Sequence, residues 1–118
     1  MTIILFSNDL MAASNIRGPA QARNVPLTLA SNIEAVLNHC NEPGVDLVLL
    51  DLTTPGLDPE AIVPRLRSAP CPPGAIVAFG PHVQEGWLAA ATAAGCDEVL
   101  TRGQFHAQAA ALLGRYVS

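Results

Sequence analysis

The chain alternates between short hydrophobic runs and longer segments in which apolar residues have helical spacing. The hydrophobic runs cover positions 3–6, 25–30, 45–50, 75–79 and 98–100. Within each run the apolar residues are largely continuous rather than alternating with polar ones, which is typical of strands in a parallel sheet buried on both faces. We therefore predict an α/β protein, a doubly wound (βα)5 parallel sheet in a flavodoxin-like, receiver-like three-layer sandwich.

Two of the connecting helices are predicted from apolar residues three and four positions apart: Ile33, Val36, Leu37 and Cys40 in one, and Phe105, Ala109, Leu112 and Tyr116 in the other. Ser31 or Asn32 can cap the first of these helices. The alanine-rich segment 83–94 predicts a further helix, which Gly95 can end in a left-handed conformation.

Proline and glycine are expected to make two helices irregular. Gly18 and Pro19 interrupt the segment 10–24, so the first helix should end early or bend there. Asp58 and Pro59 resemble an N-cap with a first-turn proline, and Pro64 inside the same helix should kink it or delay its regular start. No linker or repeat divides the chain, and residues 1–118 are predicted to form one domain.

Composition narrows the class of protein. The formal net charge is −4, and the basic residues are six scattered arginines without a lysine, which argues against a nucleic-acid partner. No apolar run approaches the ~20 residues of a membrane span. The amino end lacks the features of a secretory signal, so a soluble cytoplasmic protein is expected. Three cysteines without CxxC spacing predict reduced thiols rather than disulfides.

Polar residues follow the predicted strands at the points where the strands end. These segments are Ser7-Asn8-Asp9, Asp51, Gly80-Pro81-His82 and Thr101-Arg102. Chemistry in an open parallel sheet collects at the carboxyl ends of its strands, so we expect these four segments to lie close together. Because the chain lacks lysine, the cation available to Asp51 is a guanidinium.

The segment that begins at Asp51 resembles the receiver domain of two-component response regulators. Asp51, Pro55 and Asp58 match the family's D-x-x-x-P-x-x-D pattern, in which the aspartate at the end of the third strand accepts a phosphoryl group. Gly95 resembles the glycine after the fourth helix, and the resemblance covers essentially the whole chain. It implies a receiver fold, a role in signal transduction and a protein partner, either a sensor kinase or an output protein.

The sequence departs from the family at positions used for switching. The acidic pair after the first strand falls on Asn8 and Asp9, or, with a shift of one residue, on Ser7 and Asn8. The family's hydroxyl, aromatic and lysine positions fall on Gly80, Val99 and Arg102. Without the hydroxyl and the ring, a modified Asp51 lacks the usual two-state readout.

These departures also affect metal binding and phosphoryl transfer. No cofactor is certain; Asp9, Asp51 and the Thr53 carbonyl would form a weak Mg²⁺ site if one is present. An arginine is larger than a lysine and differently directed, so Arg102 can pair with Asp51 without reproducing lysine's role. We therefore expect a stand-alone atypical receiver that works through protein interaction, with conventional phospho-switching impaired.

Two alternatives remain open. One is a functional aspartyl-phosphate receiver in which Arg102 replaces the lysine. The other is a small-molecule-binding flavodoxin-like domain that uses a cleft beneath Asn8, Asp51 and His82. No GxSxG, P-loop or GxGxxG motif occurs, and an enzyme is not expected.

Each site residue also has a plainer reading. Asp51 can be a strand-end carboxylate bonded to loop amides, Asp9 a helix N-cap, and Arg102 their counter-ion. Trp87 on the fourth helix is either a core or an interface residue. The resemblance implies a dimer surface between the fourth and fifth helices, so a homodimer is one expected assembly. The roles of His82 and Trp87 and the identity of the partner stay open.

Overall fold

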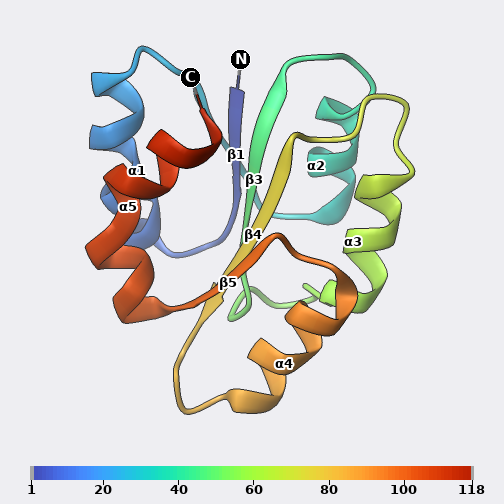
Figure 1. The fold of residues 1–118 in the computed structure, drawn as a ribbon. Helices are drawn as coiled ribbons and strands as arrows, with labels where there is room; N and C mark the ends of the chain where they lie inside the picture. Colours follow the sequence, from blue (N-terminus) through green and yellow to red (C-terminus); the bar gives the residue numbers. More distant parts are fainter. Residues whose placement is uncertain (1, 118) are drawn as a thin grey trace.

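A computed structural model describes residues 2–117 as five alternating strand and helix units (Figure 1). The elements are β1 (Thr2–Phe6), α1 (Leu10–Ala22), β2 (Leu27–Ala30), α2 (Ile33–His39), β3 (Val45–Asp51), α3 (Pro59–Arg67), β4 (Ala75–Gly80), α4 (Glu85–Ala94), β5 (Glu98–Thr101) and α5 (Arg102–Tyr116). All the strands pair in parallel in the order β2-β1-β3-β4-β5. The predicted doubly wound (βα)5 fold is confirmed.

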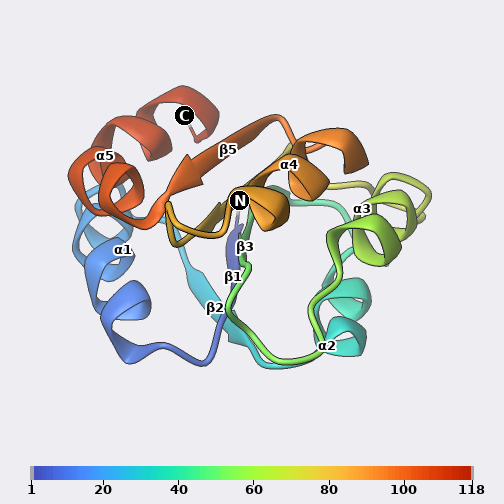
Figure 2. The same ribbon diagram turned by 90° about the horizontal axis from the view of Figure 1, so that it is seen from below.

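Helices cover both faces of the sheet. Figures 1 and 2 show α1 and α5 together on one face and α2, α3 and α4 on the other. Successive residues of a strand point to opposite faces, and here Leu47 and Leu49 of β3 join the cluster under α1 and α5, whereas Val48 and Leu50 join the opposite cluster. Two buried clusters explain why the strand sequences are continuously apolar.

The strand register brings the candidate residues to one edge of the sheet. Phe6, the last residue of β1, is paired with Leu50, and Asp51 is paired with Phe79. Gly80 is in turn paired with Thr101. The carboxyl ends of β1, β3, β4 and β5 therefore lie side by side at the edge that faces the viewer in Figure 2.

Three helix ends follow the predicted signals. The Asn32 side chain accepts a hydrogen bond from the backbone N–H of Ala35 and so caps α2. Asp58 caps α3 with Pro59 in the first turn. Gly95 ends α4 with φ 103°, a left-handed conformation that glycine adopts without a steric penalty.

Helices α1 and α3 continue through the residues that are expected to interrupt them. Helix α1 runs through Gly18 and Pro19 to Ala22, so it does not end early, and a bend there stays a prediction. Gly18 has no Cβ to clash with the ring of the following proline, which relieves the usual restriction before proline. Helix α3 begins at Pro59 without delay and continues past Pro64. Burial of Ile62, Val63 and Leu66 against the sheet outweighs the lost backbone hydrogen bond.

Two further sequence expectations bear on the type of protein. Within residues 2–117, no helix combines the length and the apolar character required to cross a bilayer. Cys40, Cys71 and Cys96 are free thiols, as predicted. Burial raises the pKa of the Cys96 thiol to about 11, so this side chain is uncharged near neutral pH.

Candidate functional site

Asp51 ends β3 with its carboxylate almost completely enclosed. Its exposed fraction is 1%. Oδ1 accepts hydrogen bonds from the backbone N–H of Thr53 (3.0 Å) and from the Thr53 hydroxyl (2.7 Å). Oδ2 accepts a hydrogen bond from the Ser7 hydroxyl (2.6 Å) at the end of β1. Two hydroxyls and one backbone amide therefore solvate the buried carboxylate.

Asp9 lies between β1 and α1 and contacts two different groups. Its Oδ1 accepts a hydrogen bond from the Met11 backbone N–H (2.9 Å), which makes Asp9 the N-cap of α1. Its Oδ2 accepts a hydrogen bond from a terminal nitrogen of Arg102. The Arg102 hydrogen bond, helped by the Met11 N–H, holds the pKa of Asp9 below its usual value.

The guanidinium of Arg102 spans Asp9 and Asp51. While Nη1 donates to Asp9, Nη2 lies 3.3 Å from the Thr53 hydroxyl oxygen and 3.6 Å from Asp51 Oδ1. Arg102 thus does not form a two-bond bridge to Asp51 alone. At an effective dielectric constant near 20, charges ~4 Å apart attract by about 4 kcal/mol, so both acids favour this placement.

The position of Arg102 follows from the start of α5. The Thr101 side chain accepts a hydrogen bond from the Gln104 N–H (3.1 Å), and the Gln104 side chain accepts one from the Thr101 N–H (2.9 Å). This capping box lets the helix begin at Arg102, directly after β5 and without a loop. Phe105 then fixes the first turn by stacking on Phe79, with ring centroids 3.9 Å apart.

The structure brings together most, but not all, of the residues predicted from the sequence. Asp9, Asp51, Thr53 and Arg102 form one connected cluster, and Ser7 joins it. Asn8 and His82 are exposed, and within residues 2–117 neither side chain makes a hydrogen bond to this cluster. Of the residues that follow β1, Ser7 rather than Asn8 therefore contacts Asp51.

Gly80, which is expected at the family's hydroxyl position, leaves little room for a side chain because Leu52 packs beside it. A Cβ atom placed on Gly80 would lie 3.2 Å from Cβ and 3.3 Å from Cδ1 of Leu52. Leu52 is itself buried, so a serine or threonine at position 80 would require it to move. Val99, at the aromatic position, packs partly buried against the cluster that contains Leu52.

Sequence reasoning missed the hydroxyl groups of Ser7 and Thr53. Thr53 was expected to offer its carbonyl to a metal, whereas its side chain bonds to Asp51 and Arg102. The spacing of Ser7 from the end of β1 was the available signal, because a hydroxyl at that edge is within reach of Asp51. The capping-box spacing of Thr101 and Gln104 was a second signal, since it predicts that α5 begins at Arg102.

A hollow of about 440 Å³ opens beside this cluster, between the β3–α3 loop and α4. Its lining residues are Leu52, Thr53, Thr54, Pro55, Leu57, Asp58, Pro59, Trp87 and Ala90. Asn8, Asp51 and His82, the residues expected beneath a ligand cleft, do not line it. The hollow therefore gives the small-molecule alternative no support at the place where the sequence predicted it.

The resemblance to receivers raises the question of Mg²⁺, which prefers near-octahedral oxygen ligands. Whether Asp9, Asp51 and Thr53 bind it stays a prediction, but the chemistry of these groups can be compared with that need. Among residues 2–117, no group of three or more acidic, histidine or cysteine side chains is arranged to hold a metal. Both carboxylates already accept hydrogen bonds and face the Arg102 guanidinium. With Arg102 in this place, the residues do not fit a divalent cation.

Comparisons with known proteins give matches among solved structures only. No family model and no curated protein matches the sequence. A response regulator from Hahella chejuensis superposes with a TM-score of 0.83 at 16% identity, covering 99% of this chain and 95% of that one. The receiver domain of a Pseudomonas aeruginosa sensor histidine kinase, solved with a magnesium ion in its active-site cleft, gives 0.79 at 18% identity, covering 98% and 95%.

A third match comes from a complex. The receiver domain of the Saccharomyces cerevisiae response regulator Ssk1, crystallised with the histidine phosphotransfer protein Ypd1, gives a TM-score of 0.69 at 18% identity, with 86% of this chain and 78% of that chain covered. These identities are low, so the matches bear on architecture. Strand order, helix placement and superposition agree that this chain has the fold of response-regulator receiver domains.

Proposed function

We propose that this protein is an atypical receiver domain in two-component signal transduction, which acts by binding a partner protein and whose conventional phospho-switching is impaired. The observation that carries the proposal is the absence of a side chain at Gly80, with Leu52 packed close to that position. Gly80 offers no hydroxyl to follow a phosphoryl group on Asp51, and a Cβ added there would lie 3.2 Å from Leu52 Cβ, so Leu52 would have to shift by a few tenths of an ångström. The hydroxyl side chain that would respond to phosphorylation in the usual switch is therefore missing.

The surroundings of Asp51 support the same proposal. The carboxylate is 1% exposed, and the hydroxyls of Ser7 and Thr53 each donate to one of its oxygens. An incoming phosphodonor must reach an enclosed carboxylate whose oxygens already accept hydrogen bonds. Such bonds, which contribute about 1.5–3 kcal/mol each, stabilise the carboxylate and so oppose its attack on phosphorus.

The surface around the site supports a binding role rather than an enzymatic one. Leu10 and Met11, in the first turn of α1, are 82% and 69% exposed, and Val83, in the β4–α4 loop, is 72% exposed. Exposed apolar side chains next to a polar cluster are typical of protein-binding surfaces. A partner that covers the carboxyl edge of the sheet would bury them; the Ssk1 receiver domain is an example of a receiver crystallised with a partner protein.

Phosphorylation with a small donor tests the proposal. The protein is incubated with acetyl phosphate and Mg²⁺, and the intact mass is followed by mass spectrometry. The expected result is no stoichiometric phosphoryl adduct, with the D51N variant as the matched control. A stoichiometric acyl phosphate that disappears in D51N would contradict impaired phosphorylation.

A functional phosphoreceiver with Arg102 in place of lysine is the second candidate. It is favoured by one observation: Nη2 of Arg102 lies 3.6 Å from Asp51 Oδ1, near enough to attract a phosphoryl oxygen after a modest side-chain rotation. Beryllofluoride, which forms a phosphoryl-like adduct on aspartate, separates the two candidates. Amide shifts that extend from Asp51 to α4 would favour this second candidate, whereas an unchanged spectrum would favour the first.

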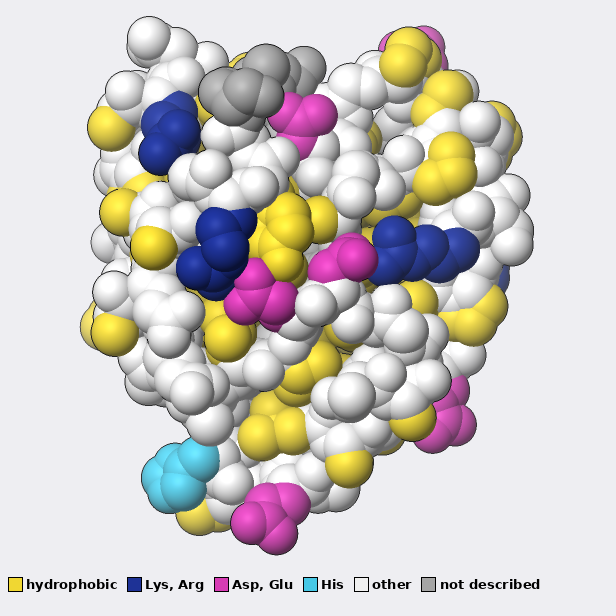
Figure 3. All heavy atoms as spheres, in the orientation of Figure 1, with side chains coloured by type: hydrophobic (Ala, Val, Ile, Leu, Met, Phe, Trp, Pro, Cys, Tyr) yellow, Lys and Arg dark blue, Asp and Glu magenta, His cyan; other side chains and the backbone are white. Residues whose placement is uncertain are grey.

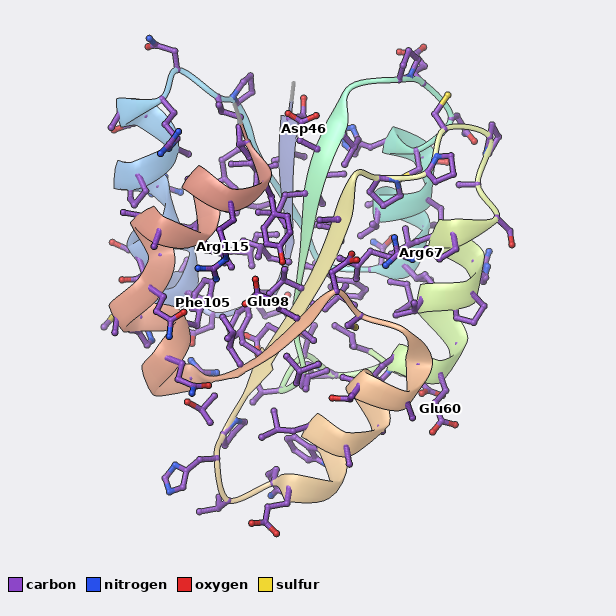
Figure 4. All side chains as sticks on the ribbon, viewed as in Figure 1. Asp46, Glu60, Arg67, Glu98, Phe105 and Arg115 are labelled. Carbon is purple, nitrogen blue, oxygen red and sulfur yellow. The ribbon has the colours of Figure 1, made fainter. Side chains whose placement is uncertain are left out.

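A homodimer is a further part of the proposal. Figure 3 shows hydrophobic side chains exposed on the face formed by α4, β5 and α5, between groups of opposite charge. These charged groups include two ion pairs: Arg67 with Asp97 (2.8 Å), and Arg115 with Glu98 (2.9 Å), the second of which is labelled in Figure 4. An apolar strip flanked by ion pairs is a self-complementary arrangement that a two-fold dimer can use.

A further inference from the structure

We propose that the guanidinium of Arg102 is the built-in cation of this site and takes the place of a divalent metal ion between Asp9 and Asp51. The inference deepens the proposed function, because it concerns the regulation of the same site. It rests on that function in one respect only, the expectation that a receiver holds a metal. It is carried by the contacts of the two carboxylates and by the way in which Arg102 is held.

Every oxygen of the two carboxylates already has a protein donor. Asp9 Oδ1 accepts from the Met11 N–H at 2.9 Å, and Asp9 Oδ2 accepts from Arg102. Asp51 Oδ1 accepts from the N–H and hydroxyl of Thr53 at 3.0 and 2.7 Å, and Asp51 Oδ2 accepts from the Ser7 hydroxyl at 2.6 Å. A metal ion would have to share these oxygens with donors that already lie against them.

Charge opposes metal entry as well. The two acids bring two negative charges, and Arg102 neutralises one of them from a place where its two terminal nitrogens reach both acids. A divalent ion between the same acids would lie within a few ångströms of the guanidinium, where repulsion in a partly buried site is strong.

The arginine is held in place by its backbone. Arg102 is the first residue of α5, and the capping box between Thr101 and Gln104 fixes the chain on either side of it. Its side chain is about two-thirds buried, with 30% exposed. The guanidinium therefore occupies the site as a permanent part of the fold, whereas a metal ion would bind and dissociate.

Manganese binding tests the inference, with Mn²⁺ as a probe for divalent ions and water-proton relaxation as the readout. The R102Q variant removes the cation and leaves both acids, and we expect it to bind Mn²⁺ about ten-fold or more tightly than the unaltered protein. The matched control is R65Q, which loses the same charge from the exposed Arg65–Glu34 pair (3.5 Å), and we expect it to bind like the unaltered protein. Adding D9N to R102Q should abolish the gain.

A second measurement does not depend on the folding of a variant. The unaltered protein is titrated with Mg²⁺ to ~10 mM, well above the range of a specific site, while the amide signals of Asp9 and Thr53 are followed by NMR. We expect these signals to stay in place. Saturable shifts there, or equal Mn²⁺ affinity in R102Q and the unaltered protein, would overturn the inference.

The two proposals fail in different ways. Tight Mg²⁺ binding without phosphorylation of Asp51 would overturn the role of Arg102 and leave the impaired switch standing. Phosphorylation of Asp51 by acetyl phosphate in the absence of any metal would overturn the impaired switch and leave Arg102 as the cation of the site.

Discussion

The Ser7 hydroxyl makes the shortest hydrogen bond to Asp51 among the residues described, at 2.6 Å. A serine at this place provides a donor where a second acid would provide another negative charge. The Ser7 hydroxyl therefore supplies a hydrogen bond that water would otherwise give to this buried carboxylate. The hydroxyls of Ser7 and Thr53 complete the environment of this acid together with the Thr53 N–H and the Arg102 guanidinium.

Replacing Ser7 with alanine tests how much this hydroxyl contributes. S7A leaves Asp51 Oδ2 without its donor, and we expect the free energy of unfolding to fall by about 1.5–3 kcal/mol. Denaturation by urea at pH 7 measures it. The control is S14A, which removes an exposed hydroxyl in the middle of α1 and should be neutral or slightly stabilising. Equal stability of S7A and the unaltered protein would show that the bond has no net value.

The only tyrosine of the chain provides a test by pH. Burial, together with the 2.5 Å hydrogen bond to Glu98, raises the pKa of Tyr116 to about 12. Because the pKa is raised in the folded state, this contribution to stability is complete below pH ~10, the unfolded value, and is lost as the pH rises through about 12.

Absorbance of the phenolate measures this titration directly. We expect a midpoint near 12 in the folded protein and near 10 in denaturant. The E98Q variant keeps an acceptor but removes the negative charge, so its midpoint should be lower than that of the unaltered protein. E60Q, on the exposed start of α3, is the control (Figure 4). An identical midpoint in E98Q and E60Q would contradict the assigned role of Glu98.

Much of the site could be predicted from single residues, and the rest depended on side-chain directions. Asp51, Asp9 and Arg102 follow strands whose ends meet, so their proximity follows from topology. The contact of Arg102 with both acids does not follow from topology, because it is set by the point at which α5 begins and by the length of the side chain. The role of Leu52 beside Gly80 depends on packing across two strands, and local sequence carries no signal for it.

At the scale of elements, the two prolines inside helices show where local rules fail. The strands were predictable because both faces of the sheet are apolar, and the caps of α2 and α3 were predictable because Asn32 and Asp58 have strong local preferences. The lengths of α1 and α3 were not, since packing against the sheet and the absence of a Cβ at Gly18 offset the effect of proline. Tertiary context therefore decided those helices.

A pair of glycine substitutions tests this explanation. Apart from its chain neighbours and the backbone of its own helix, an added Cβ meets no atom within 4 Å at either Gly18 or Gly86, and both residues are helical. G86A in α4 should raise the free energy of unfolding by about 0.5–1 kcal/mol. G18A should give no such gain, because its methyl group would face the ring of Pro19. Thermal unfolding of the two variants measures the difference, and equal stabilisation would contradict the role given to Gly18.

At the scale of the whole molecule, the proposed homodimer has a direct optical test. Trp87, the single tryptophan, lies on α4 with 43% of its surface exposed. If α4 joins the interface, the elution volume should fall and tryptophan emission should move to shorter wavelength as the concentration rises from ~1 µM to ~1 mM, the range of weak complexes. Constant elution volume and emission over this range would count against a dimer through α4.

Helices α4 and α5, which begin at neighbouring strand ends, differ in how their first turns are secured. Helix α5 begins with reciprocal hydrogen bonds between Thr101 and Gln104, whereas Gln84, the N-cap of α4, makes no side-chain cap bond. Backbone amides at the start of α4 should therefore exchange with deuterium sooner than those at the start of α5. Protease cleavage should likewise begin between β4 and α4. Any shape change that a partner exploits has its least costly route there, at the strand end next to the one that carries Arg102.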